Sequence, residues 1–163
     1  MSLDTSWEAE LAAYLQELSA AQDELLGVLN RKLALLGAAD SAGLQALAPI
    51  EQALSERLKA CYQRRNEMLG RAGAQGLPAD SLRSLTGSLQ GKQRKQLIAD
   101  VSQAESKSRL LQHQSLTNWV VTQRALLHLS HLLEIIATGG RLRPTYGREE
   151  PAAVSGALLN RAV

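Results

Sequence analysis

The sequence predicts an all-α protein, in the form of an elongated antiparallel three-helix bundle or coiled coil with a flexible C-terminal tail. Leucine and alanine, two strong helix formers, supply 31 and 24 of the 163 residues. Isoleucine and valine supply only 4 and 6, and phenylalanine is absent. Because sheets draw their cores from β-branched and aromatic residues, these counts argue against a β-sandwich and an ordinary α/β enzyme. The hydrophobic share of 45% is ample for a folded core.

The first helix is expected over about residues 5–37. Thr5 and Glu8 have the spacing of a capping box at its start. From Trp7 onward a four-three repeat of apolar residues continues along the helix, with Lys32 as its one polar position. Further leucines widen this stripe, so the helix should contact more than one neighbour.

A second helix is expected over about residues 42–70. Gly37 is expected to act as the C-cap of the first helix, and Asp40 or Ser41 as the N-cap of the second. Pro49 lies inside the second pattern, where a proline predicts a kink or a restart of the helix. The short connection between the two helices predicts that they pack antiparallel.

Residues 70 to 92 are expected to form a loop that contains a short helix at about residues 79–86. Its glycines Gly70, Gly73 and Gly76 are spaced three residues apart, which is similar to a glycine-rich phosphate-binding loop. No strand precedes them and no Gly-Lys-Ser/Thr ending follows, so a plain connector is the better interpretation.

The third helix is expected over about residues 92–138, which at 1.5 Å per residue approaches ~70 Å. Its first half is sparsely apolar, whereas the stretch from Leu126 to Ile136 is crowded with leucine and isoleucine. This is more apolar surface than two neighbouring helices need, so another protomer or a partner helix should cover it, unless the tail folds back over it. The residues predicted to lie in the core are Leu18, Leu25, Leu58 and Leu126.

The helical domain is expected to cover residues 1–140, and the tail residues 141–163. The tail composition does not support a core of its own, so we expect it to be mobile in the free protein. A short amphipathic helix is expected to form there on contact with a partner, since about ten residues are too few for a stable isolated helix. Tyr146, which combines a large apolar ring with a hydroxyl group, is expected to anchor the tail. The candidate contacts of the tail helix are Val154, Leu158 and Leu159.

Charge and cysteine content suggest the setting in which the protein works. The formal net charge of +2 does not point to nucleic acid or to an anionic membrane. The single cysteine, Cys61, excludes an internal disulfide framework and is expected to be a buried thiol in a reducing compartment. No secretory signal and no membrane-spanning run is recognisable, so a cytoplasmic location is expected.

The sequence contains no recognisable catalytic motif, so we expect neither an enzyme nor a bound cofactor. His128, His131 and Glu134 lie on adjoining turns of one helix and raise the alternative of a metal site. Such a site needs ligands from a second helix, and no matching motif is present, so no metal is expected. The basic clusters at Arg64-Arg65 and at Lys92, Arg94 and Lys95 are interrupted by acidic residues, so they are expected to be solvated helix faces.

The better candidates for function lie on the late third helix. Leu129, Leu133 and Ile136 share one side of that helix and are predicted to bind a partner. A glutamate in place of one of them would put a charge on a surface that must lose its water on binding.

Several of these features together resemble the FlgN-type flagellar export chaperones. The resemblance covers most of the chain: the long leucine-rich first helix, the turn from Leu36 to Leu47, and the Arg-Arg-Asn-Glu-Met-Leu end of the second helix at residues 64–69. It also includes the glutamine- and leucine-rich third helix and the ending Pro-Thr-Tyr-Gly at residues 144–147.

The resemblance implies a non-enzymatic cytoplasmic chaperone that holds hook–filament junction (hook-associated) proteins and delivers them to the flagellar type III secretion gate. It also implies a role for Tyr146 at the cytoplasmic domain of that gate. Neither nucleic-acid binding nor membrane insertion is expected. The alternative is a self-associating coiled-coil adaptor or structural protein without an export role, and the sequence leaves homodimer formation open.

Overall fold

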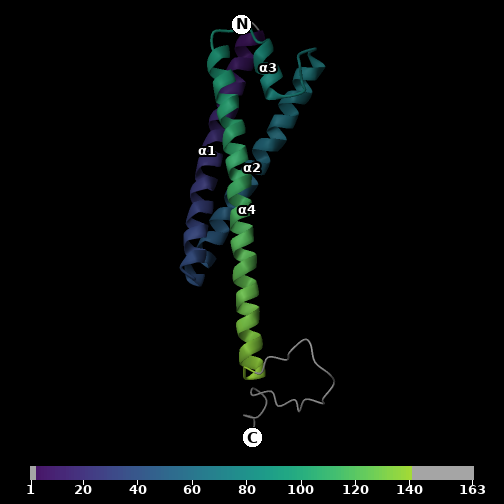
Figure 1. Cartoon of the computed structure of the whole chain (residues 1–163). Helices are drawn as coiled ribbons and strands as arrows, with labels where there is room; N and C mark the ends of the chain where they lie inside the picture. Colours follow the sequence, from purple (N-terminus) through teal and green to yellow (C-terminus); the bar gives the residue numbers. More distant parts are fainter. Residues whose placement is uncertain (1–2, 141–163) are drawn as a thin grey trace, which may run out of the picture. The chain divides into compact units, whose positions relative to one another are not determined.

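The computed structural model describes residues 3–140, and these residues are helical apart from short connecting segments (Figure 1). The elements are α1 (Leu3–Gly37), α2 (Ser41–Ala74), α3 (Leu82–Ser88) and α4 (Arg94–Thr138). The predicted all-α fold is confirmed, and the predicted tail contacts lie outside the described residues. Internal contacts divide the chain into two units, Met1–Asn118 and Trp119–Val163, which are described separately.

In the first unit, α1 and α2 form an antiparallel hairpin whose register is marked by a ladder of ion pairs (Figure 1). Three acidic residues on α1 and three arginines on α2 recur at seven-residue steps, and a fourth pair has the opposite polarity. The pairs are Glu10–Arg71, Glu17–Arg64, Glu24–Arg57 and Lys32–Glu51. Each pair is partly exposed and stabilises the fold by only about 0–1 kcal/mol. Their regular spacing favours one alignment of the two helices over shifted alignments.

The first part of α4 runs parallel to α1 and is joined to it by two buried amide side chains. The Gln22 side chain is fully buried and donates to the Ala104 carbonyl oxygen at 3.1 Å and to Ser108 Oγ at 2.9 Å. Farther along, Asn118 Nδ2 donates to the Leu29 carbonyl oxygen at 3.0 Å. Because a buried amide needs its partners, these bonds favour one register of α4 on α1.

The core of the first unit contains most of the residues that the helical repeats predict. Leu18 and Leu25 are buried as predicted, and Leu58 is half-buried. The prediction for Leu126 is wrong, because 52% of this residue is exposed. The unit that contains α1 and α2 ends at Asn118, so Leu126 does not belong to its core.

The start of α1 also differs from the prediction. The chain is already helical at Leu3, so Thr5 does not cap the helix. Glu8 is instead buried in the first unit, where its carboxylate accepts a hydrogen bond of 3.1 Å from the backbone N–H of Gln93. A carboxylate is favourable there because Gln93 immediately precedes α4, and the amino end of a helix carries partial positive charge.

The second helix is one continuous element, so the predicted restart at Pro49 does not occur. It also continues beyond the predicted end at residue 70, and Gly70 and Gly73 are helical. A helical glycine costs about 1 kcal/mol relative to alanine. In this segment the cost is offset by apolar side chains that the last turns of α2 bury, namely Met68, Leu69 and Ala72.

The connection between α2 and α4 contains the short helix α3, slightly later than predicted. Ser81 caps α3 in a capping box: its hydroxyl oxygen accepts from the Ser84 N–H, and its own backbone N–H donates to Ser84 Oγ. Leu82 and Leu85 of this helix are buried in the core.

All three long helices end in the same hydrogen-bonded turn, in which the residue at one fixed position adopts a left-handed conformation. This residue is Gly76 after α2 (φ 73°) and Gly139 after α4 (φ 61°), but it is Ala39 after α1 (φ 52°). The N–H of Asp40 donates to the Leu35 carbonyl oxygen at 3.0 Å and closes the turn. The predicted C-cap, Gly37, is the last residue of the helix instead.

Replacing Ala39 by glycine is therefore expected to stabilise the protein by about 1 kcal/mol. A side chain in the left-handed region costs roughly 1–2 kcal/mol, and the greater freedom of glycine in the unfolded chain cancels part of the gain. Urea denaturation of the two proteins measures the difference. Ala38→Gly is the control and should not stabilise, and an Ala39→Gly protein no more stable than wild type would contradict the prediction.

Candidate functional site

The described part of the second unit is a helical segment with unusually apolar exposed side chains. Among residues 119–136, the only Asp, Glu, Lys or Arg residues are Arg124 and Glu134. We call the following set, in which each residue is 39–66% exposed, the α4 apolar face: Trp119, Val120, Leu126, Leu127, Leu129, Leu132, Leu133, Ile135 and Ile136. Nine large apolar side chains exposed on one helix are typical of a protein-binding site.

The predicted partner-binding residues on α4 all belong to this face. Leu129, Leu133 and Ile136 are 55%, 66% and 59% exposed. Their spacing of four and three residues places them on one side of the helix. The other predicted contacts lie outside the described residues; they are Tyr146, Val154, Leu158 and Leu159.

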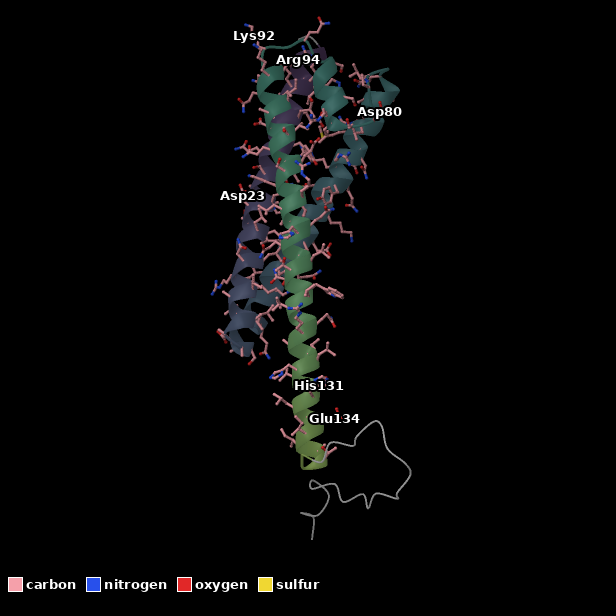
Figure 2. The ribbon with its side chains drawn as sticks, viewed as in Figure 1. Asp23, Asp80, Lys92, Arg94, His131 and Glu134 are labelled. Atoms are coloured by element: carbon pink, nitrogen blue, oxygen red, sulfur yellow. The ribbon has the colours of Figure 1, made fainter. Side chains whose placement is uncertain are left out.

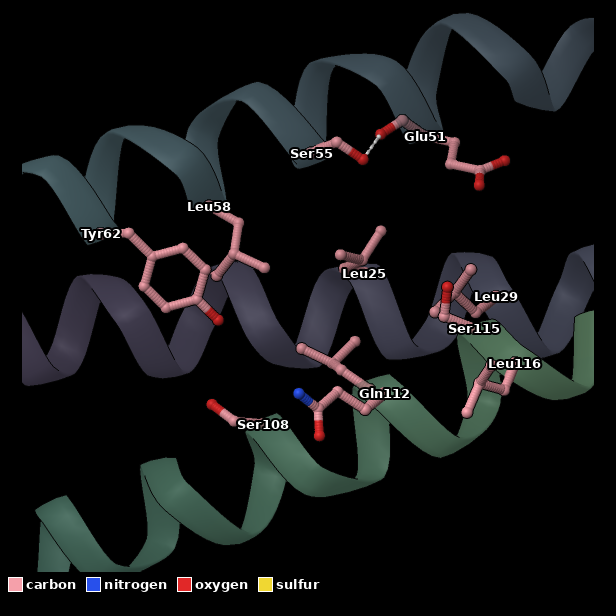
Figure 3. Close-up of a pocket in the computed structure, with 11 residues that line it drawn as sticks. Leu25, Leu29, Glu51, Ser55, Leu58, Tyr62, Ser108, Gln112, Ser115 and Leu116 are labelled. Atoms are coloured by element: carbon pink, nitrogen blue, oxygen red, sulfur yellow. Dashed lines mark hydrogen bonds between the residues drawn. The ribbon is translucent and has the colours of Figure 1, made fainter. Parts of the chain in front are cut away.

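A second apolar surface, which the sequence analysis missed, is a groove within the first unit (Figure 3). Its volume is about 550 Å³, and three helices line it. We call it the α2–α4 groove; its lining residues are Leu25, Leu29, Glu51, Ser55, Leu58, Tyr62, Ser108, Leu111, Gln112, Ser115 and Leu116. The sequence feature that could have predicted this groove is the pair Ser108 and Ser115 on the first half of α4, because small side chains between packed helices leave space.

The chemistry of the groove suits apolar side chains better than a reaction. Its floor consists of Leu25, Leu29 and Leu111, all of them buried. Glu51 is the one charged residue of the lining, and Lys32 Nζ holds its two carboxylate oxygens at 2.8 and 2.9 Å. Leu116, at 63% exposure, leaves part of the apolar lining open to solvent.

The described residues also include the candidate metal site and the basic clusters. Within residues 3–140, no three His, Cys, Asp or Glu side chains gather as a metal-binding group, so His128, His131 and Glu134 do not form one there. His131 and Glu134 are labelled near the end of α4 in Figure 2. Arg64, from one of the basic clusters, pairs with Glu17 at 2.9 Å. Across the same described range, no helix is both long and apolar enough to cross a membrane.

Cys61 is buried in the core, as the sequence predicted. Burial, and secondly the negative charge of Glu17, raise the pKa of its thiol above the ordinary value. The thiolate is therefore disfavoured, which makes Cys61 a poor nucleophile.

The Tyr14 side chain is fully buried near Cys61, and its hydroxyl has no hydrogen-bond partner among the described residues. Burial is the largest cause that raises the pKa of Tyr14 from 10.0 to about 12. Because the folded state holds this proton more tightly than the unfolded state, stability should fall as the pH rises from about 10 to about 12.

We expect Tyr14→Phe to remove this alkaline loss, which reaches up to about 1.4 kcal/mol per pH unit for one proton. At neutral pH the variant should be about 1 kcal/mol more stable, since it no longer buries an unpaired hydroxyl. Urea denaturation at a series of pH values measures both effects. Tyr62→Phe, on an exposed tyrosine, is the matched control, and an unchanged alkaline slope in Tyr14→Phe would contradict the assignment to Tyr14.

The fold and these two surfaces define a helical protein suited to binding other helices through apolar contacts. Comparison with protein families gives a match to the model described as FlgN protein over residues 1–151. The chain belongs to the FlgN family, a family of flagellar export chaperones. Neither a search of the curated proteins nor a search of the solved structures found a match.

Proposed function

We propose that this protein is a cytoplasmic export chaperone that binds hook–filament junction proteins and delivers them to the flagellar type III secretion gate. The observation that supports this most directly is the α4 apolar face, whose nine apolar side chains are exposed in the free chain. Membership of the FlgN family supports flagellar export substrates as the class of cargo.

The physical basis of the proposal is the recognition of one amphipathic helix by another. A secreted protein with a helical end exposes apolar residues until it assembles, and those residues are prone to wrong contacts. A chaperone helix that covers them replaces water by apolar contacts, as in other helix-in-groove complexes. On α4, Leu129, Leu133 and Ile136 are the residues that we propose make these contacts.

We propose that the C-terminal tail makes a further contact with the cargo or with the cytoplasmic domain of the export gate. The support is the sequence pattern alone, in which Tyr146 is followed by apolar residues at helical spacing. These residues are Val154, Leu158 and Leu159.

A Leu133→Glu protein is expected to bind the junction proteins at least about tenfold more weakly, because its carboxylate must lose water on binding. Isothermal titration calorimetry with purified junction proteins measures the affinity. The matched control is Leu110→Glu, at a leucine of α4 that is 51% exposed but lies outside the α4 apolar face.

Circular dichroism should show the same helix content in both variants. Equal binding by Leu133→Glu and wild type would place the cargo site elsewhere. A chain that ends at Gly140, tested in the same titration, measures what the tail contributes.

A further inference from the structure

The α2–α4 groove has the shape and the length to accommodate one short helix. In this groove, α2 and α4 form the two walls and α1 forms the floor (Figure 3). Three of the lining side chains, Ser55, Ser108 and Ser115, are small, and the floor is made of leucines. The α2 wall, from Glu51 to Tyr62, is about 17 Å long at 1.5 Å per residue. Such a concave surface accommodates the side chains of a further helix better than a flat one.

The C-terminal sequence contains a segment that matches the groove in length and pattern. Residues 152–163 would extend over about 18 Å as a helix, close to the length of the α2 wall. Val154, Leu158 and Ala162 recur every four residues and form a narrow apolar stripe. Pro151 precedes the segment, and proline is favoured at the start of a helix. Because so short a helix is not stable alone in water, it needs a surface to form on.

The chain between α4 and this segment is long enough to reach the groove. The N–H of Gly140 donates to the Ile135 carbonyl oxygen at 2.8 Å, so at Gly140 the chain has returned to the last turns of α4. From Ile135 back to Leu116, the last groove residue on α4, the helix covers at most about 29 Å. Residues 141–151 span up to about 36 Å when extended. Residues 152–163 can therefore enter the groove while α4 stays intact.

The charges of the groove and of the segment are compatible. Glu51, the one charged residue of the lining, lies with Leu116 at the end of the groove where the chain would enter (Figure 3). A helix that enters there has its amino end beside the Glu51 carboxylate, and the partial positive charge of that end favours an acidic neighbour. The only charged side chain of residues 152–163 is Arg161, so the segment brings no acidic side chain that Glu51 would repel.

The α4 apolar face suits the same segment less well. At 100° per residue, its nine exposed side chains extend over roughly two-thirds of the helix circumference. The narrow stripe of residues 152–163 could cover only a small part of so broad a face. In the groove, by contrast, the stripe would be enclosed on three sides.

We infer that, in the free protein, residues 152–163 dock as a further helix in the α2–α4 groove of their own chain, with Val154 and Leu158 on the leucine floor. Residues 141–151, which include Tyr146, remain outside the groove as the connection. This inference does not depend on the identity of the cargo. It adds a means of regulation, because the tail residues proposed to contact the cargo or the export gate become available only when the segment leaves the groove.

Disulfide cross-linking in the full-length chain tests the arrangement. A chain with Cys61→Ala, Ser55→Cys and Val154→Cys should form an intrachain disulfide under mild oxidation, detected by non-reducing electrophoresis. Ala53→Cys, exposed on α2 but outside the groove lining, is the control for Ser55→Cys and should cross-link to Val154→Cys far less. Equal yields at the two positions would overturn the inference. So would a cross-link between two mixed chains that carry one of the two cysteines each, because the segment would then lie in the groove of another molecule.

Hydrogen exchange gives a second, independent test. In the wild-type protein, the amides of residues 152–163 should exchange at least about tenfold more slowly than in a peptide of the same sequence. Ser115→Trp, which fills the groove, and Leu158→Glu, which leaves every groove residue unchanged, should each remove this protection. Asn160→Glu, on the opposite side of the predicted helix, is the matched control and should retain it.

Two results of this experiment would overturn the inference. One is exchange at the rate of the peptide in the wild-type protein. The other is protection that persists in a folded Ser115→Trp protein, which would place the segment on another surface, such as the α4 apolar face. Circular dichroism verifies that the variants are folded.

The outcome is separable from that of the proposed function, since neither experiment contains a junction protein. A docked segment in a protein that binds no junction protein would leave the inference in place and remove the proposed function. Junction-protein binding by a protein whose segment is not docked would do the opposite.

Discussion

Replacing Leu11 by alanine is expected to lower the free energy of unfolding by about 2–5 kcal/mol. Leu11 is fully buried in the main core cluster, so truncation removes apolar contacts and leaves a cavity. Leu25→Ala should fall toward the lower end of this range, because Leu25 borders the α2–α4 groove and its surroundings can adjust. Urea denaturation monitored by circular dichroism gives the values.

Leu126→Ala is the matched control for Leu11→Ala, since it makes the same change on a residue that is 52% exposed. It should alter the free energy of unfolding by less than about 0.5 kcal/mol. A loss in Leu126→Ala as large as that in Leu11→Ala would show that Leu126 is a core residue after all.

Replacing Gly91 by alanine is expected to cost about 1–3 kcal/mol, because the added methyl group would overlap the Glu8 carboxylate. Glu8 is buried and hydrogen-bonded to the Gln93 N–H, so it cannot move aside without losing that bond at the start of α4. The cost should appear in urea denaturation, and hydrogen exchange should show faster opening of the first turn of α4.

A double-mutant cycle identifies the cause. Glu8→Ala alone should also destabilise, because it removes the acceptor of the Gln93 N–H. In the Glu8→Ala background, Gly91→Ala should cost much less than in wild type, since the overlapping carboxylate is gone. Additive effects of the two substitutions would mean that Gly91 is required for a reason other than its contact with Glu8. Gly87→Ala is a suitable control, as no atom lies within 4 Å of the position its methyl group would take.

Local sequence was sufficient to predict the helices. The bounds of α1 and α4 agree with the expected ranges to within about two residues, because helix propensity and apolar periodicity are properties of neighbouring residues. The end of α2 could not be placed in the same way. Gly70 and Gly73 weaken the local signal, and the helix continues because its last turns are buried against the core.

Burial was predicted correctly for Leu18 and Leu25 in the first unit and wrongly for Leu126 in the second. Leu25 and Leu126 occupy similar apolar patterns, yet one is 8% and the other 52% exposed. An apolar repeat predicts which side of a helix is favourable to bury, but whether that side is buried depends on the packing of the other helices. Leu129, Leu133 and Ile136 were assigned to a partner for this reason, and their exposure agrees with that hypothesis.

By itself, the sequence determined the helical class, the extent of α1 and α4 and the apolar character of late α4. Only the tertiary structure decided that the Glu8 carboxylate accepts a hydrogen bond at the start of α4 and that ion pairs align α1 with α2. It also decided that α1, α2 and α4 surround an open groove. The physical reason is that helix formation depends on hydrogen bonds four residues apart, whereas these features join residues that are distant in the chain. Their partners become neighbours only after the helices have packed.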